Sequence, residues 1–166
     1  RDSCVEDDCI FDSISGSAPI HVGSKAVMES FGAKLEGNDM ENALTLPDGV
    51  LRYGTKPFAV GVWFKTTITK HNSTVFGNRS AGSHGNFFCI RYARNKIHCS
   101  FDDNKNFAGL SCDIELNDGE WHHVAAVRKG TQHFLYVDGN ISCTKTTKKP
   151  VDINKNKTDR YRLGAW

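Results

Sequence analysis

The chain has 166 residues, and its 21 lysine and arginine residues nearly balance 19 aspartate and glutamate residues. This length suits one domain with a sizeable core, and the net charge of +2 argues neither for nor against nucleic acid. No apolar run approaches the roughly 18 residues of a membrane span. We therefore expect a single domain over 1–166, with no nucleic-acid partner and no membrane insertion.

In chain order, apolar residues alternate with polar ones in short runs that end at Gly, Asn or Asp, a pattern typical of strands and turns. Strands are predicted over 42–50, 57–67, 73–76 and 110–116, with a glycine-rich loop at 77–86 and a hairpin at 86–102. In the 57–67 strand, Phe58 and Phe64 share one face and Trp63 lies on the other. Closely spaced short strands predict an all-β sandwich or barrel.

A disulfide is predicted within the hairpin at 86–102. If residues 93–95 form a three-residue loop, Cys89 lies directly opposite Cys99. At that separation a cross-strand bridge is geometrically allowed. The hairpin therefore predicts a Cys89–Cys99 disulfide.

The segment 118–139 predicts the first part of a three-stranded meander. A strand over 121–128, a turn at 129–130 and a return strand over 131–137 place Leu135 opposite Val124. Asp138-Gly139 then forms a tight turn, because a primed turn needs positive φ at both central positions. The third strand begins at residue 140.

His122 and His123 are adjacent in this segment, so strand alternation points them to opposite faces of the sheet. They cannot chelate one metal ion together, and no zinc-binding spacing is present. Asp138 occupies a turn in which aspartate is favoured for backbone reasons. The segment is therefore interpreted as scaffold, with one histidine hydrogen-bonding a neighbouring loop.

The string "NDGEWHHVAAVRKGTQHFLYVDG" resembles the signature hairpin of laminin G-like and pentraxin-like domains, which belong to the concanavalin A-like group of lectins and glucanases. "GAKLEGNDMENALTLPDG", "KPFAVGVWFKT" and "YRLGAW" resemble the opening and a late strand of that family. The resemblance covers residues 31–166, and residues 1–30 fit it loosely. It implies a jelly-roll sandwich of two antiparallel sheets, used outside the cell to bind glycans or proteins, often with calcium.

Members of this family usually continue past the Leu-Gly strand into a final strand. The chain ends at Trp166, so we expect that C-terminal strand to be missing and the exposed sheet edge to be open to association. The module would then be one segment of a larger adhesin or receptor.

Six cysteines lie outside any C-x-x-C spacing, and we prefer Cys4–Cys9 and Cys112–Cys143 for the four outside the hairpin. The alternative is that some are free buried thiols. Asn-x-Ser/Thr sequons begin at Asn72, Asn78, Asn140 and Asn156. Disulfides and glycosylation both favour a secreted or cell-surface protein.

The sequence predicts a recognition module rather than an enzyme. Glucanases of this fold carry an E-x-D-x-x-E strand, and here only Asp113 and Glu115 share a face without the third carboxylate. A glycoside hydrolase or its accessory domain is therefore the least favoured interpretation. Binding of glycans or glycoconjugates is favoured, and protein adhesion without sugar is the first alternative.

Candidate ligand-binding residues on the loop rim are Arg79, His84, Asn86, Tyr92 and Arg94. A second alternative is binding of heparin-like polyanions through a basic segment, which comprises Lys145, Lys148, Lys149, Lys155, Lys157, Arg160 and Arg162. If calcium is bound, the best oxygen donors are Asp102 and Asp103, with Asp39 third.

Overall fold

A computed structural model describes residues 9–10, 20–29, 32–35, 40–47, 52–69, 72–79, 86–153 and 160–164. The larger sheet contains β1 (Cys9–Ile10), β2 (Ile20–Val22), β5 (Leu44–Thr45), β14 (Arg162–Leu163), β7 (Ser73–Gly77), β8 (Phe87–Ala93), β9 (Lys96–Asp102) and β10 (Phe107–Cys112). The smaller sheet contains β13 (Asn140–Thr146), β12 (Gln132–Val137), β11 (Trp121–Lys129) and β6 (Phe58–Lys65). A hairpin of β3 (Val27–Glu29) and β4 (Gly32–Lys34) and a 3-10 turn, η2 (Met40–Asn42), complete the described elements.

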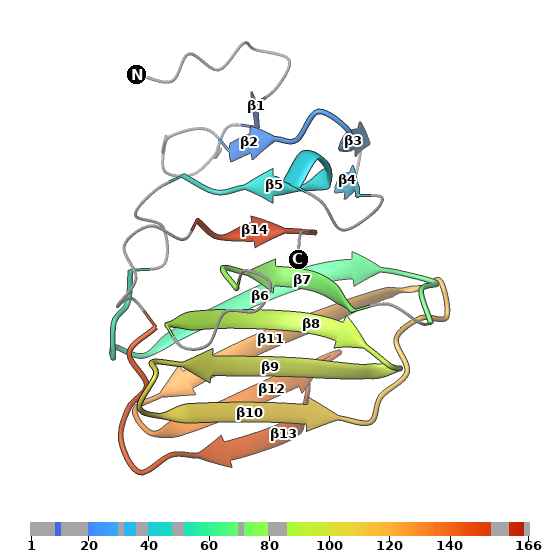
Figure 1. Ribbon diagram of the computed structural model, residues 1–166. Coiled ribbons are helices and arrows are strands. Elements are labelled where there is room, and N and C mark those ends of the chain that lie inside the picture. The colour runs from blue at the N-terminus through green and yellow to red at the C-terminus, as the bar shows by residue number, and fades with distance from the viewer. Residues whose placement is uncertain are drawn as a thin grey trace.

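The two sheets face each other as an antiparallel sandwich, as predicted (Figure 1). β13 lies against β10 and β6 lies against β7, so the smaller sheet covers only the β7–β10 half of the larger one. The strands β14, β5, β2 and β1 extend beyond β6, where the described part of the smaller sheet ends. Within the described residues, no helix is long and apolar enough to cross a membrane.

Strand alternation explains the core between the sheets. Phe88 and Ile90 of β8 and Phe101 of β9 point inward and are fully buried against Val124 and Leu135 of the smaller sheet. The rings of Phe88 and Phe101 lie 4.9 Å apart, centroid to centroid, on neighbouring strands. Period-two burial of apolar side chains therefore holds the sandwich together.

Arg128 is the largest fully buried side chain, and it sits at one end of this core. Its guanidinium donates hydrogen bonds to the carbonyl oxygens of Val151, Gly54 (2.7 Å) and Lys56 (2.6 Å). Its Cζ lies 4.7 Å from the centre of the Phe58 ring. Burial lowers the pKa of Arg128, although guanidinium groups stay charged in proteins. Arg128 thereby ties two connecting segments to the end of β11.

The predicted Cys89–Cys99 disulfide is wrong because the β8–β9 turn is one residue shorter than expected. Arg94 and Asn95 both have positive φ (53° and 58°), so they form a two-residue turn. Cys89 consequently pairs with Ser100, and Cys99 pairs with Ile90. A one-residue slip sends the two cysteines to opposite faces, and both are buried free thiols.

The predicted meander is confirmed, with a small shift in its first turn. β11 continues to Lys129 and the turn falls at Gly130-Thr131, so Leu135 pairs with Ala126 instead of Val124. This change moves the pairing by two residues and leaves every side chain on its predicted face. Asp138 (φ 48°) and Gly139 (φ 81°) form the second turn as predicted.

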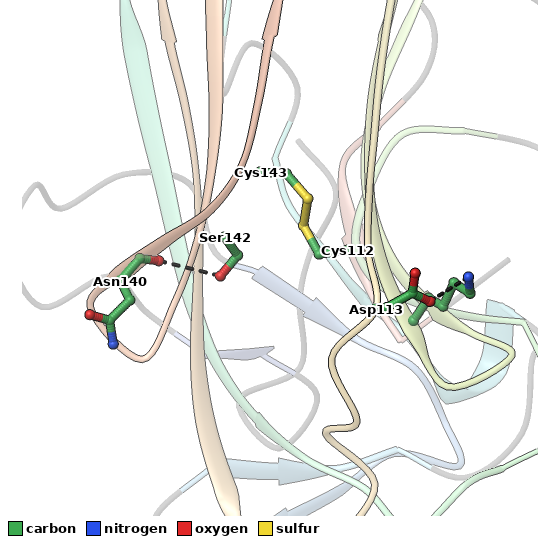
Figure 2. Close-up of a disulfide and its surroundings, with 6 residues drawn as sticks. Cys112, Asp113, Asn140, Ser142 and Cys143 are labelled. Carbon is green, nitrogen blue, oxygen red and sulfur yellow. Dashed lines mark hydrogen bonds and ion pairs between the residues drawn. A yellow bond between two sulfur atoms is a disulfide. The ribbon is translucent and has the colours of Figure 1, made fainter.

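The predicted Cys112–Cys143 disulfide is confirmed, and it bridges β10 to β13, the edge strands at one side of the two sheets (Figure 2). It closes the side of the sandwich where no further described strand covers the core. The predicted Cys4–Cys9 bridge lies outside the described side chains.

Candidate functional site

The predicted loop-rim site does not assemble. Tyr92 is 2% exposed, and its hydroxyl contacts Asn117 Oδ1 at 2.9 Å and accepts a hydrogen bond from the Leu116 N–H at 3.1 Å. Alternation with Phe88 and Ile90 places Tyr92 on the inner face of β8, and it also lines a cavity beside the edge of the smaller sheet. Its role in ligand binding stays a prediction.

The arginines predicted for the same site lie at opposite ends of β8. The Arg79 guanidinium stacks 4.7 Å from the ring of Phe87, the first residue of β8, whereas Arg94 follows its last residue. A seven-residue strand spans about 20 Å. Asn86 lies beside the Arg79 end, and His84 lies outside the described residues.

Asn78 is not a feasible glycosylation site in this fold. It is 3% exposed, and its Oδ1 accepts a 2.8 Å hydrogen bond from the Phe88 N–H. A glycan on its side-chain nitrogen would have to displace this packing. The sequons at Asn72 and Asn140 are exposed, and the one at Asn156 lies outside the described residues.

Asp102 and Asp103, the candidate calcium ligands, hold a loop together. Asp102 Oδ1 accepts the Asn104 N–H at 2.8 Å, and Asp103 accepts the N–H groups of Lys105 (2.8 Å) and Asp152 (3.1 Å). Burial acts to raise the pKa of Asp103, but its hydrogen bonds outweigh burial and lower that pKa. No group of three His, Cys, Asp or Glu side chains suited to a metal occurs among the described residues, and calcium binding stays a prediction.

The described members of the basic segment are divided between two regions. Lys145 is on β13 at one edge of the smaller sheet, and Lys148 and Lys149 follow it. Arg162 is on β14, and three strands of the larger sheet separate β14 from β10, the edge strand next to β13 (Figure 1). The described basic side chains therefore do not form one continuous surface, while Lys155 and Lys157 lie outside the described residues.

His122 links two loops through carboxylates on both sides of its ring. Its Nδ1 lies 2.8 Å from Asp138 Oδ2 and its Nε2 lies 3.1 Å from Asp118 Oδ1. Asp138 Oδ1 also accepts the His123 N–H at 2.8 Å. The expected contact of one histidine with a neighbouring loop is thus present, and Asp138 contributes its side chain as well as its turn conformation.

Interactions within this cluster shift the pKa values of His122, Asp118 and Asp138. The hydrogen bond to Asp138 raises the pKa of His122, with partial burial opposing it and Asp118 adding to it. The hydrogen bond from His122 lowers the pKa of Asp138, and the Glu120 N–H lowers the pKa of Asp118 before His122 adds its effect. The two carboxylates therefore stabilise the protonated form of His122 relative to its neutral form.

Linkage predicts how stability depends on pH at this cluster. Because the folded pKa of His122 is raised, its stabilisation is full below its ordinary pKa of 6.5 and is lost as pH rises through the folded value. The contribution of the lowered Asp118 and Asp138 pKa values is present above 3.8 and is lost in acid. We expect the cluster to stabilise the fold most between these two values.

Urea unfolding from pH 5 to pH 8 measures this dependence. The free energy of unfolding lost by His122→Asn, relative to wild type, should shrink as pH rises above 6.5. Burial lowers the pKa values of His98 and His133, so these two residues make stability rise with pH in wild type and variant alike. The difference in unfolding free energy between the two proteins therefore isolates His122. An exposed control, His21→Asn, should show no such trend. A pH-independent difference for His122→Asn would contradict the ionic role of the cluster.

A cavity of about 370 Å³ opens beside β6, at the edge where the described smaller sheet ends. Val62 and Phe64 of β6 line its inner wall, and the larger sheet contributes Leu44 and Leu163. The β3–β4 hairpin forms another wall through Ala33. The cavity is therefore mainly apolar and is built from segments distant in sequence.

Two exposed tryptophans stand at this cavity. Trp63 is 62% exposed and Trp121 is 52% exposed, and both line it together with Lys65, which pairs directly with Trp121. A Cβ placed on Gly32 would lie 4.0 Å from Trp121 Cη2, so the indole of Trp121 reaches across to the β3–β4 hairpin. Polar groups at the cavity include the hydroxyl-bearing Thr66.

The tryptophans extend onto the outer face of the smaller sheet. The ring of Trp63 contacts that of His123, with centroids 5.1 Å apart. His123 lies over Gly61. A Cβ at Gly61 would come within 2.8 Å of His123 Nε2, so this close packing favours glycine at this position. The two tryptophans therefore place flat ring faces beside an apolar cavity that the cation Lys65 and the hydroxyl-bearing Thr66 also line.

Sequence reasoning placed Trp63 on the outward face of its strand but did not identify it as a site residue. The available signal was a large aromatic side chain at an outward position of an alternating strand, which recurs at Trp121. An exposed large apolar side chain is more informative than a buried one.

Comparison with known proteins agrees with the sandwich. The family model described as the concanavalin A-like lectin/glucanases superfamily, of laminin G type, matches residues 37–165. No curated protein matches the chain.

Solved structures resemble this chain at low sequence identity. Domains LG4-5 of the mouse laminin α1 chain superpose with a TM-score of 0.56 at 20% identity, covering 73% of this chain and 30% of that one. The CBM40 of Ruminococcus gnavus IT-sialidase, bound to α2,3 sialyllactose, gives 0.55 at 16% identity, covering 63% of this chain and 61% of that one. The binding domain of botulinum neurotoxin DC in complex with SialylT gives 0.67 at 13% identity, covering 92% of this chain and 40% of that one.

This chain thus spans less than two thirds of the length of each of these structures. At such identities the structural likeness establishes the fold. The family match covers most of the chain and most of the resembling segments found in the sequence. The chain belongs to the concanavalin A-like lectin/glucanase superfamily, with laminin G domains among its structural relatives.

Proposed function

We propose that this protein is a non-catalytic glycan-binding module and that sugars bind at the Trp63–Trp121 cavity. The observation that carries the proposal is two indoles, each more than half exposed, beside an apolar cavity of about 370 Å³. Burying such rings against a sugar removes apolar surface from water, because the C–H groups on one face of a pyranose pack on an aromatic plane. Apolar cavities with a few polar groups are typical small-ligand sites.

The ligands of the structural relatives support the same class of ligand. The Ruminococcus gnavus CBM40 is bound to sialyllactose, and cell entry of botulinum neurotoxin type C depends on interaction with two ganglioside molecules. We extend the proposal to a setting outside the cell, because the Cys112–Cys143 disulfide is favoured in oxidising compartments. If calcium takes part, we expect it to bind near the loops, because the described residues contain no cluster of metal-binding side chains.

Alanine substitution tests the site. Trp63→Ala and Trp121→Ala should each weaken binding to the best ligand of a glycan array by at least about tenfold, as expected for aromatic residues at a binding centre. Phe107→Ala is the matched control, because Phe107 is 57% exposed on the larger sheet, away from the cavity. Isothermal titration with and without a chelator also tests the calcium expectation.

Equal losses in all three variants, or none, would contradict the proposed site. Release of reducing sugar from a bound glycan would contradict a non-catalytic role. If no glycan binds and the protein associates with itself or another chain, protein adhesion replaces sugar binding. The open side of β6, which pairs only with β11 among the described strands, would then be the first edge to examine.

A further inference from the structure

Lys65 occupies a central position at the cavity. It pairs with Trp121 on the neighbouring strand and follows Trp63 by two residues, so the three side chains share the outer face of the smaller sheet. All three also line the cavity beside the β6 edge. The Lys65 side chain therefore neighbours both exposed tryptophans on this face.

No carboxylate neutralises this ammonium within the part of the chain that the structure describes. Lys25 and Lys96 form ion pairs with Glu41 and Asp113, whereas no ion pair joins Lys65 to an acidic side chain. Among the acidic residues that precede Trp121, the strand partner of Lys65, Asp118 is engaged with His122. Glu120, which precedes Trp121, is not within ion-pair distance of Lys65.

The surrounding outer face of β6 and β11 carries no acidic side chain. On β6 the outward positions before Lys65 are Ala59, Gly61 and Trp63. On β11 the outward positions from Trp121 to Val127 carry no acidic group, and Lys129 at the far end is a cation. An anion on this face would therefore meet the Lys65 ammonium and no carboxylate of β6 or β11. The hairpin wall of the cavity carries one acidic residue, Glu29, which pairs with the lining Gly32.

This pattern suits a ligand with an apolar face and an anionic substituent. The pyranose faces would pack on Trp63 and Trp121, and the anion would accept hydrogen bonds from the Lys65 ammonium. An ammonium beside apolar rings has a lower local dielectric than one in open solvent, which strengthens the attraction. A neutral sugar would use the same rings without the charge contact.

We propose that Lys65 makes the cavity selective for acidic saccharides that carry a carboxylate or a sulfate. This inference rests on the proposed glycan-binding function and adds the residue and the charge of its ligand. Lys65 contacts the acidic group directly, and the tryptophans bind the sugar rings whether or not they are charged. Affinity for acidic sugars should therefore fall with salt, whereas affinity for neutral sugars should not.

Titration calorimetry with sialyllactose, sulfated lactose and lactose tests the proposal. Wild type should bind at least one acidic ligand about fivefold or more tightly than lactose, a ratio in the range expected for a partly exposed charge pair. Lys65→Gln should remove that preference by lowering the affinity for the acidic ligands to that for lactose, and Lys65→Arg should retain it. Lys129→Gln, on the same face at the other end of β11, is the matched control.

The outcomes separate this inference from the proposed function. If Trp63→Ala abolishes binding but Lys65→Gln keeps the acidic preference, the glycan site stands and the role of Lys65 is wrong. Equal binding of lactose and both acidic ligands by wild type would also overturn it. Preference for sialyllactose alone identifies the carboxylate as the ligand group, and preference for sulfated lactose alone identifies the sulfate. If no saccharide binds at all, both proposals fail.

Discussion

Replacing Arg128 with methionine is expected to lower the free energy of unfolding by about 3 kcal/mol, because three carbonyl oxygens, one buried and two partly buried, lose their donor and an unpaired buried acceptor costs about 1–3 kcal/mol. Those oxygens belong to Gly54, Lys56 and Val151. Methionine fills much of the arginine volume, so the loss reports on hydrogen bonding more than on a cavity.

Buried ionic groups can often be replaced by apolar ones without loss when all partners are replaced together. That route is closed here, because the partners of Arg128 are backbone carbonyls that no side-chain substitution removes. Urea unfolding followed by circular dichroism measures the effect, and the exposed Arg52→Met serves as the matched control. A loss for Arg128→Met no larger than that for the control would contradict its role as an anchor.

The double substitution Cys112→Ala/Cys143→Ala should lower the free energy of unfolding by roughly 3–4 kcal/mol, following the chain-entropy relation for a closed loop. The two cysteines are 31 residues apart in sequence. Their bridge joins the edge strands β10 and β13, so its loss also frees one side of the sandwich to open. Chemical denaturation with and without dithiothreitol measures the effect.

Reductant should bring the wild-type protein close to the stability of the double variant and should change the variant much less. This comparison separates the Cys112–Cys143 bridge from any other pairing among the cysteines. Cys89→Ala, which alters a buried free thiol, should leave the response to reductant intact. If reductant left the unfolding free energy of the wild-type protein unchanged, the bridge would not contribute to stability.

The pairing of the strands depended on the lengths of the turns, which the backbone conformations of single residues set. Period-two alternation correctly assigned the faces of β6 and β11, because side-chain direction in a strand follows from backbone geometry alone. The Cys89–Cys99 pairing failed, because Arg94 adopts positive φ and shortens the β8–β9 turn by one residue. Few non-glycine residues do so, and the sequence carries no clear mark of it.

Local sequence patterns also did not predict which side chains outside the central strands are buried. Asn78 satisfies the sequon and lies in a polar, glycine-rich stretch, yet its side chain is hydrogen-bonded to β8 and buried. The hairpin register likewise decided that Cys99 lies beside Ile90 and not beside Cys89. Such positions are decided by contacts between segments, which composition does not encode.

What the sequence determined by itself is the all-β class and the faces of β6 and β11, because these follow from periodicity and turn chemistry within one segment. The family followed from the resemblance of its motifs. The cavity came only from the tertiary structure. Trp63 and Lys65 approach Trp121 through strand pairing, and the β3–β4 hairpin and β14 complete its walls. Gly164 must lack a Cβ there, because one would overlap Leu35. Sites built from contacts this distant along the chain depend on how the sheets pack, which local alternation leaves undetermined.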